Sequence, residues 1–217
     1  QSLVKEIVTQ ELQLDPKRFE PKKVRWAISN AKNQGWSPDD LEANAEGQRG
    51  KLSADVYRRY RKALAANNAL DFDDLLLLPV QLLQQNEQVR GYWYRRFRHV
   101  LVDEYQDTNR TQYELIKLLV TDGKEPQQVD DWSGRSVFVV GDADQSIYSF
   151  RAADFTILMG FQDDFGDKAP DDVTQTMVKL EENYRSTATI LEAANALISN
   201  NSERIDKVLR PTRGEGE

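Results

Sequence analysis

Two short apolar runs, each followed directly by acidic residues, constrain the fold of this chain more than any other feature. Residues 99–102 read HVLV and continue into Asp103 and Glu104. Residues 137–140 read VFVV and continue into Gly141–Asp142 and then Ala143–Asp144–Gln145. Runs of this length and composition are typical of buried strands, so the sequence predicts two strands that both end in carboxylates.

The segment between these strands has helical periodicity over residues 108–119, with Tyr113, Ile116 and Leu119 on one side. A strand, a helix and a second aliphatic strand indicate a parallel sheet covered by helices. Residues 176–180 predict a third strand, residues 155–165 a short helix, and residues 186–199 a helix capped by Ser186 or Thr187. Ligands of such sheets bind outside the carboxyl ends of the strands, which is where the acidic residues lie.

The first third of the chain has no strand pattern. Helical spacing recurs over residues 2–14, 20–34 and 53–68, and Ser37 is placed to cap a short helix near Leu41. Residues 71–85 and 86–96 continue as helices, with Pro79 starting a new segment or kinking the first of them. The fold class expected is therefore α/β, with an all-helical subdomain placed before the sheet.

The net charge of −7 is unevenly distributed. Residues 1–70 hold 13 Lys and Arg against 9 Asp and Glu, and the remainder holds 16 against 27. A basic first part is compatible with a local phosphate-binding face, although an ordinary solvated surface explains it equally well.

The absence of cysteine excludes disulfides and thiolate metal sites and fits a cytoplasmic protein. The single histidine, His99, disfavours a histidine-based zinc site. No apolar run approaches 18 residues, so no membrane partner is expected. The chain starts at Gln1, which suggests a fragment of a longer protein.

Four acidic groups at one edge of a sheet repel one another unless a cation offsets their charge. A hydrated Mg²⁺ held by one or two carboxylates suits this position, and sites of this kind usually also bind substrate phosphates. An Asp that holds the ion and a Glu that orients or deprotonates water fit phosphoryl transfer.

Three longer segments carry a resemblance to a known family. VLVDEYQDTN (100–109), VFVVGDADQSIYSFRAAD (137–154) and LEENYRST (180–187) resemble, in this order, motifs II, III and IV of the UvrD/Rep/PcrA-type superfamily 1 DNA helicases. The upstream LDFDDLL (70–76) also resembles that family. The resemblance implies a partial RecA-like parallel sheet, with ATP and Mg²⁺ as cofactors.

The resemblance assigns roles at the nucleotide site. Asp103 matches the Mg²⁺-binding acid, and Glu104 matches the catalytic base for ATP hydrolysis. Gln145 matches the residue that senses the γ-phosphate. Tyr184 falls where the family stacks on adenine, and Arg185 falls where an arginine finger contacts the γ-phosphate, a role that suits the permanent charge of guanidinium.

The resemblance also implies contacts with DNA. Tyr148 and Phe150 fall where the family stacks aromatic rings on single-stranded DNA, and Arg151 belongs to the same loop. Stacking tolerates any base and contributes roughly 1–3 kcal/mol per base. The helical subdomain would contact duplex DNA, and its basic residues to test are Lys22, Lys23, Arg25, Arg58, Arg59 and Lys62.

The chain also departs from the family pattern. The phosphate loop GxxxxGK[ST] and motifs V and VI are absent, and motif III has Ala152 where glycine is usual. The polar stretch 121–136 is interpreted as a surface insertion. By resemblance, residues 1–80 are the inserted helical subdomain, 81–175 the back half of the first RecA-like motor domain, and 176–217 the start of the second.

The function expected is that of a fragment of an ATP-dependent 3′–5′ DNA helicase of repair or replication, without ATPase activity of its own. Its partners would be single-stranded and duplex DNA together with repair or replication proteins. Two alternatives stay open, namely an exonuclease or a subunit of a helicase–nuclease, and a non-catalytic nucleic-acid-binding module. A purely structural helical protein is disfavoured by the two strands and their acidic ends.

Overall fold

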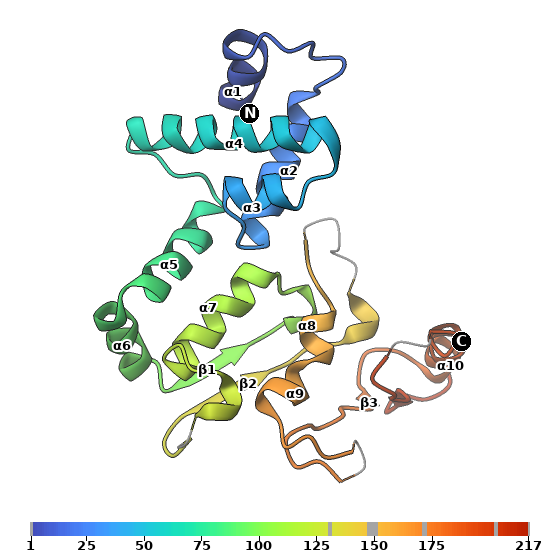
Figure 1. Ribbon diagram of the computed structural model, residues 1–217. Helices are drawn as coiled ribbons and strands as arrows, with labels where there is room; N and C mark the ends of the chain where they lie inside the picture. Colours follow the sequence, from blue (N-terminus) through green and yellow to red (C-terminus); the bar gives the residue numbers. More distant parts are fainter. Residues whose placement is uncertain (1, 130–131, 147–151, 171–172, 202–203, 217) are drawn as a thin grey trace.

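A computed structural model describes residues 2–129, 132–146, 152–170, 173–201 and 204–216. Figure 1 shows a helical unit that carries the N-terminus, a central unit around a small sheet (residues 74–165), and a C-terminal unit beside it (residues 182–211). The α-helices are α1 (Ser2–Glu6), α2 (Pro21–Asn33), α3 (Pro38–Ala43), α4 (Gly47–Ala66), α5 (Asp74–Gln85), α6 (Glu87–Arg96), α7 (Arg110–Thr121), α8 (Thr156–Met159), α9 (Phe161–Phe165) and α10 (Ala188–Ile198).

The remaining elements are short. A π-helical turn, η1 (Ile7–Glu11), follows α1, and the 3-10 turns are η2 (Tyr105–Asp107), η3 (Pro126–Gln128) and η4 (Ala143–Gln145). The strands are β1 (His99–Val102), β2 (Ser136–Val139), β3 (Glu182–Asn183) and β4 (Arg210–Pro211).

The helical unit, α1 to α4 with η1, has its own apolar core. Its buried members are Val4, Ile7, Val8, Val24, Ile28, Ala31, Val56 and Tyr57. Ser37 caps α3 as predicted, because its hydroxyl accepts from the Asp40 N–H and the Asp40 carboxylate accepts from the Ser37 N–H. Pro79 lies inside α5, which continues through it to Gln85 as one helix.

The parallel pairing of the two predicted strands is confirmed. β1 pairs with β2 from His99–Ser136 to Val102–Val139. The apolar side of the sheet, with Val102, Val137 and Val139, packs against a core of Tyr105, Tyr113, Ile116, Ile157 and Leu158. The opposite side is open, with Leu101 exposed by 73% and its register partner Phe138 by 59%.

Two sequence predictions were wrong in this part of the chain. The strand predicted over residues 176–180 does not form, and the nearest strand is β3, which pairs in parallel with β4. Val178 and Leu180 are 81% and 75% exposed, so the alternating apolar residues have no surface to pack on. The helix predicted over 155–165 is two helices, α8 and α9, separated at Gly160.

The C-terminal helix was predicted over residues 186–199, and α10 begins two residues later at Ala188. Thr187 occupies its N-cap position without a side-chain capping hydrogen bond. Within the described ranges, no helix is long and apolar enough to cross a membrane.

Candidate nucleotide site at the strand ends

The carboxyl ends of β1 and β2 are joined by backbone hydrogen bonds. The Val140 N–H donates to the Val102 carbonyl (2.8 Å), and the Tyr105 N–H donates to the Val140 carbonyl (2.9 Å). The turn that contains Asp103 and Glu104 therefore lies directly beside the turn that begins at Gly141. The predicted meeting of the two acidic strand ends is confirmed.

Asp103 and Glu104 are both exposed at this edge. Glu104 has φ 51° and ψ 42°, the left-handed conformation, which is uncommon outside glycine and carries strain. Its N–H donates to Asp103 Oδ1 over 2.9 Å. The chain thus turns sharply after β1 and presents two successive carboxylates at the strand end.

Gln106 links the two turns, a role that sequence reasoning missed. It is 1% exposed; its Nε2 donates to Glu104 Oε2 (2.7 Å), and its Oε1 accepts from the Asp142 N–H (3.0 Å). The Asp142 N–H can only donate, so it fixes which end of the amide faces Glu104. A Cβ at Gly141 would lie 2.8 Å from Gln106 Oε1, which explains the glycine at that position.

Asp142 is held by several donors. Gln145 Nε2 donates to its Oδ2 (2.8 Å), the Asp144 N–H donates to its Oδ1 (3.0 Å), and Lys207 donates to the same Oδ1. Burial opposes the charged form, but the hydrogen bonds from Lys207 and Gln145 outweigh it and hold the pKa of Asp142 below its ordinary value.

Two basic residues of the C-terminal unit contact the acids at this edge of the sheet. These contacts were not predicted from the sequence. Lys207 pairs with Asp142 and Asp144, and Arg204 pairs with Asp144 (3.5 Å). Two of the four acids expected to need a metal cation therefore have basic partners within the chain.

Tyr184 and Arg185 lie in the turn between β3 and α10. Tyr184 is 71% exposed, and its hydroxyl donates to the Glu182 carboxylate, which raises the pKa of Tyr184. Arg185 is exposed; its N–H donates to Asn183 Oδ1 (3.0 Å), and its carbonyl accepts from Arg213 (3.1 Å). Both side chains are thus presented to solvent by a hydrogen-bonded turn of the C-terminal unit.

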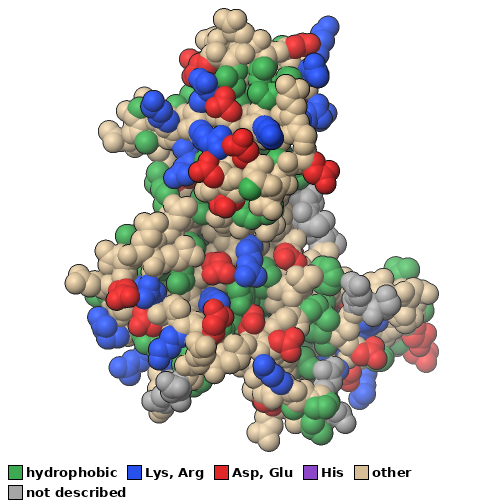
Figure 2. Space-filling model, viewed as in Figure 1, with side chains coloured by type: hydrophobic (Ala, Val, Ile, Leu, Met, Phe, Trp, Pro, Cys, Tyr) green, Lys and Arg blue, Asp and Glu red, His purple; other side chains and the backbone are tan. Residues whose placement is uncertain are grey.

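The predicted DNA-stacking residues Tyr148 and Phe150, with Arg151, lie outside the described residues. In the helical unit, Figure 2 shows basic and acidic side chains next to each other. Arg58 pairs with Asp39 and Glu42 of the same unit. The remaining basic candidates divide between those with an ion pair, Arg59 and Lys23, and those with none among the described residues, Lys22, Arg25 and Lys62.

Comparison with known proteins decides the family. The sequence model of the UvrD/REP helicase N-terminal domain matches residues 1–166. This chain belongs to the UvrD/Rep helicase family. It is 41% identical over 216 residues to the ATP-dependent DNA helicase PcrA of Staphylococcus aureus (strain Mu50), and 43% identical over 215 residues to the ATP-dependent DNA helicase UvrD1 of Mycobacterium leprae. These alignments cover 100% and 98% of the chain but 27% of each relative, so the chain spans about a quarter of their length.

The exposed carboxylates at the strand ends have the chemistry to bind Mg²⁺ that is also held by a nucleotide. The described residues contain no group of three or more His, Asp or Glu side chains that could hold a metal ion by itself. Mg²⁺ bound to a nucleotide needs only one or two carboxylates and takes its other ligands from phosphates and water. Exposed Asp103 meets that requirement, with one oxygen engaged by the Glu104 N–H.

Proposed function

We propose that this UvrD/Rep-family chain is part of an ATP-dependent 3′–5′ DNA helicase that moves along single-stranded DNA and unwinds duplex DNA. The parallel register of β1 and β2 is the observation that carries this proposal, because it brings Asp103 and Glu104 beside the Gly141–Gln145 turn. The names of the relatives support the reaction class.

In this proposal, Asp103 would hold the Mg²⁺ of Mg–ATP, which would supply positive charge to balance the negative charge of the phosphates. Glu104 accepts the proton of the attacking water. Gln106 holds the Glu104 carboxylate in one orientation through its 2.7 Å hydrogen bond. Gln145 contacts the terminal phosphate from the neighbouring turn.

The C-terminal unit completes the nucleotide site from the other side. Tyr184 stacks on the adenine, and Arg185 brings a permanent charge to the γ-phosphate. Tyr184 is 71% exposed and Arg185 is also exposed, so both side chains are accessible to a ligand, which supports this role. Hydrolysis between the two motor lobes then drives steps along the strand.

The chain by itself does not hydrolyse ATP in this proposal, because none of its 217 residues form a GxxxxGK[ST] loop. That loop supplies the backbone N–H groups and the lysine that hold the β- and γ-phosphates. Weak, salt-dependent binding of single-stranded DNA is the property expected to remain.

The test is a titration of this chain with a fluorescent single-stranded oligonucleotide at several salt concentrations, with ATPase activity read in the same samples. The proposal expects binding that weakens with salt and weakens by about fivefold or more in Tyr148→Ala and Phe150→Ala, without ATPase activity. Lys5→Ala, an exposed residue at the far end of α1, is the control. ATPase activity of the chain alone would show that the phosphate loop is dispensable, and equal binding by all variants would refute the DNA-stacking role.

A further inference from the structure

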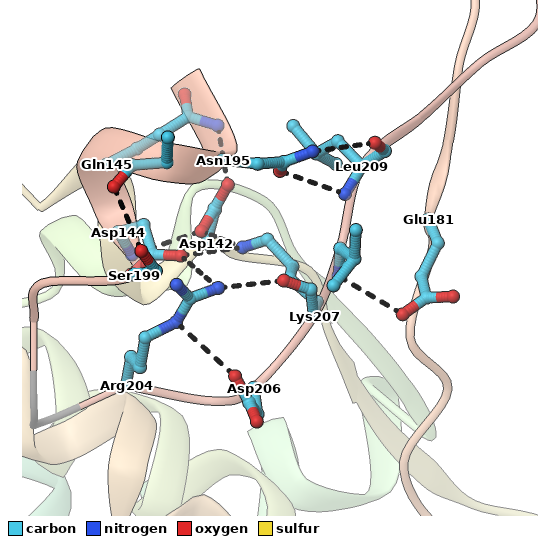
Figure 3. A network of polar contacts seen from close by, with 12 residues as sticks. Asp142, Asp144, Gln145, Glu181, Asn195, Ser199, Arg204, Asp206, Lys207 and Leu209 are labelled. Carbon is cyan, nitrogen blue, oxygen red and sulfur yellow. Dashed lines mark hydrogen bonds and ion pairs between the residues drawn. The ribbon is translucent and has the colours of Figure 1, made fainter. Parts of the chain in front are cut away.

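Four charged side chains join the C-terminal unit to the turn after β2, and we call them the clasp. The acids Asp142 and Asp144 belong to the central unit, and the bases Arg204 and Lys207 belong to the segment between α10 and β4. Lys207 donates to Asp142 and lies 3.5 Å from Asp144 Oδ2, and Arg204 Nη2 lies 3.5 Å from the same oxygen. Figure 3 shows both basic side chains directed at the acidic turn.

The clasp is largely withdrawn from water. The exposed fractions of its side chains are 9% for Arg204, 11% for Asp144, 16% for Lys207 and 23% for Asp142. Ion pairs in such positions are screened far less by salt than surface pairs. Removal of one member leaves an uncompensated charge in a poorly solvated place.

Contacts within the C-terminal unit hold the segment that carries the two basic residues. Arg204 Nη2 donates to the Lys207 carbonyl (2.8 Å). Leu209 and Asn195 exchange two hydrogen bonds, at 3.2 and 2.9 Å, which tie the segment to α10. The Val208 N–H donates to Glu181 Oε1 (3.3 Å). The position of Lys207 therefore follows the position of the whole C-terminal unit.

Within the central unit, the Asp142 carboxylate connects the clasp to Gln145. Asp142 accepts from Lys207 through Oδ1 and from Gln145 Nε2 through Oδ2. Without Lys207, the nearby charge of Asp144 would repel Asp142, and the carboxylate that orients Gln145 would lose its fixed position.

We propose that Lys207 is a positioning residue that fixes Asp142, and through it the Gln145 side chain, only while the C-terminal unit is docked on the central unit. Arg204 supports it by neutralising Asp144. The link to catalysis rests on the proposed function, in which Gln145 contacts the terminal phosphate of ATP. Docking of the C-terminal unit is then sensed at the nucleotide site through the Asp142 carboxylate, which Lys207 and Gln145 share.

The first readout is the docking of the C-terminal unit in the full chain. Because the chain has no cysteine, Gln88→Cys in α6 and Ala194→Cys in α10 place two spin labels at exposed sites of the two units. The proposal expects the distribution of distances between the two labels to be at least twofold broader in Lys207→Gln than in the labelled parent chain. In Lys207→Arg, the distribution should stay close to that of the parent. Arg210→Gln is the matched control, because Arg210 is 72% exposed and pairs with Glu181 inside the C-terminal unit.

The second readout is the side-chain NH₂ resonance of Gln145 in ¹H–¹⁵N spectra, identified by its loss in Gln145→Glu. The proposal expects this resonance to shift and to exchange with water severalfold faster in Lys207→Gln, and to stay in place in Arg210→Gln. If Lys207→Gln loses its helical circular dichroism, Lys207→Met takes its place with the same expectations, because it too removes the ammonium group that holds Asp142.

An unchanged distance distribution together with an unchanged Gln145 resonance in a folded variant would overturn the proposal. DNA titration of the same samples separates this result from the proposed function. Failure of the parent chain to bind DNA counts against the surviving DNA site and leaves the clasp result standing, because neither clasp readout involves DNA or ATP.

Discussion

Lys32 and Asp74 form a buried ion pair, with Lys32 Nζ 2.7 Å from Asp74 Oδ1. The Lys32 side chain is 0% exposed and that of Asp74 is 9% exposed. Asp71 lies at the same distance from the ammonium group, and the rings of Tyr57 and Tyr60 lie within 6 Å of it. These contacts join α2 of the helical unit to the start of α5 and account for Asp71 and Asp74 of the LDFDDLL segment.

We expect Lys32→Met to lower the free energy of unfolding by about 3–5 kcal/mol, because it leaves two carboxylates without their buried cation. Urea denaturation followed by circular dichroism measures this loss. Lys23→Met on the same helix is the control; its partner Glu20 is a surface pair, so a change below about 1 kcal/mol is expected. Equal losses in the two variants would contradict the assignment.

Gln106 offers a second test, at the candidate site. Gln106→Leu removes the acceptor of the Asp142 N–H and the donor to Glu104, so a loss of about 1–3 kcal/mol is expected. The exposed Gln128→Leu should change stability by less than about 0.5 kcal/mol. Thermal unfolding of both variants checks the prediction, and a Gln106→Leu protein as stable as the parent would show that the bridge is dispensable.

Ala152 has a backbone φ of 60°. This left-handed conformation costs a non-glycine residue about 1–2 kcal/mol. Ala152→Gly is therefore expected to raise the free energy of unfolding by about 1 kcal/mol. Ala153→Gly, at a position without positive φ, should lower it instead because glycine gains freedom in the unfolded chain. The same sign for both variants in chemical denaturation would refute the argument.

The central strands could be predicted from the sequence because a local pattern encodes them. β1 was predicted at its observed bounds, and β2 within one residue, since aliphatic runs ending in polar turns suffice to mark such strands. β3 has only two residues and forms by pairing with Arg210–Pro211, far along the chain. No local pattern marks it, and the apolar alternation at 176–180 indicated a strand that lacks a partner in the described parts.

The same division holds at the candidate site. Asp103 and Glu104 could be placed because they follow a recognisable strand, and the edge of a parallel sheet brings strand ends together. Gln106 could have been suspected only as a polar residue inside a tight turn. Lys207 lies 65 residues from Asp142, and a lone lysine in a polar segment gives no signal of a distant partner.

The loop that contains Asp167 is expected to lose stability in acid. Hydrogen bonds from the Gln175 N–H and the Thr174 hydroxyl lower the pKa of Asp167 to about 2. A lowered pKa in the folded state means that Asp167 contributes stability above its unfolded pKa near 4, and that this contribution is lost as the pH falls toward 2. Asp167→Asn should abolish this part of the pH dependence between pH 4 and pH 2. NMR titration of the carboxyl group measures the pKa directly, and a value near 4 would contradict the prediction.

The exposed side chains of Leu101 and Phe138 lead us to expect that this chain self-associates. They are register partners on the open side of the sheet, and both are more than half exposed. Parallel sheets normally have both sides covered, and adjacent exposed apolar side chains promote contact with another molecule.

The double variant Leu101→Thr, Phe138→Thr keeps residues that favour strands and removes the apolar surface. We expect its dissociation constant for self-association to rise by about tenfold, or about 1.4 kcal/mol, in sedimentation velocity over a concentration series. Val173→Thr, which removes an exposed apolar residue from a loop, is the control. If that variant weakens association as much, general surface hydrophobicity and not this sheet side drives the contact.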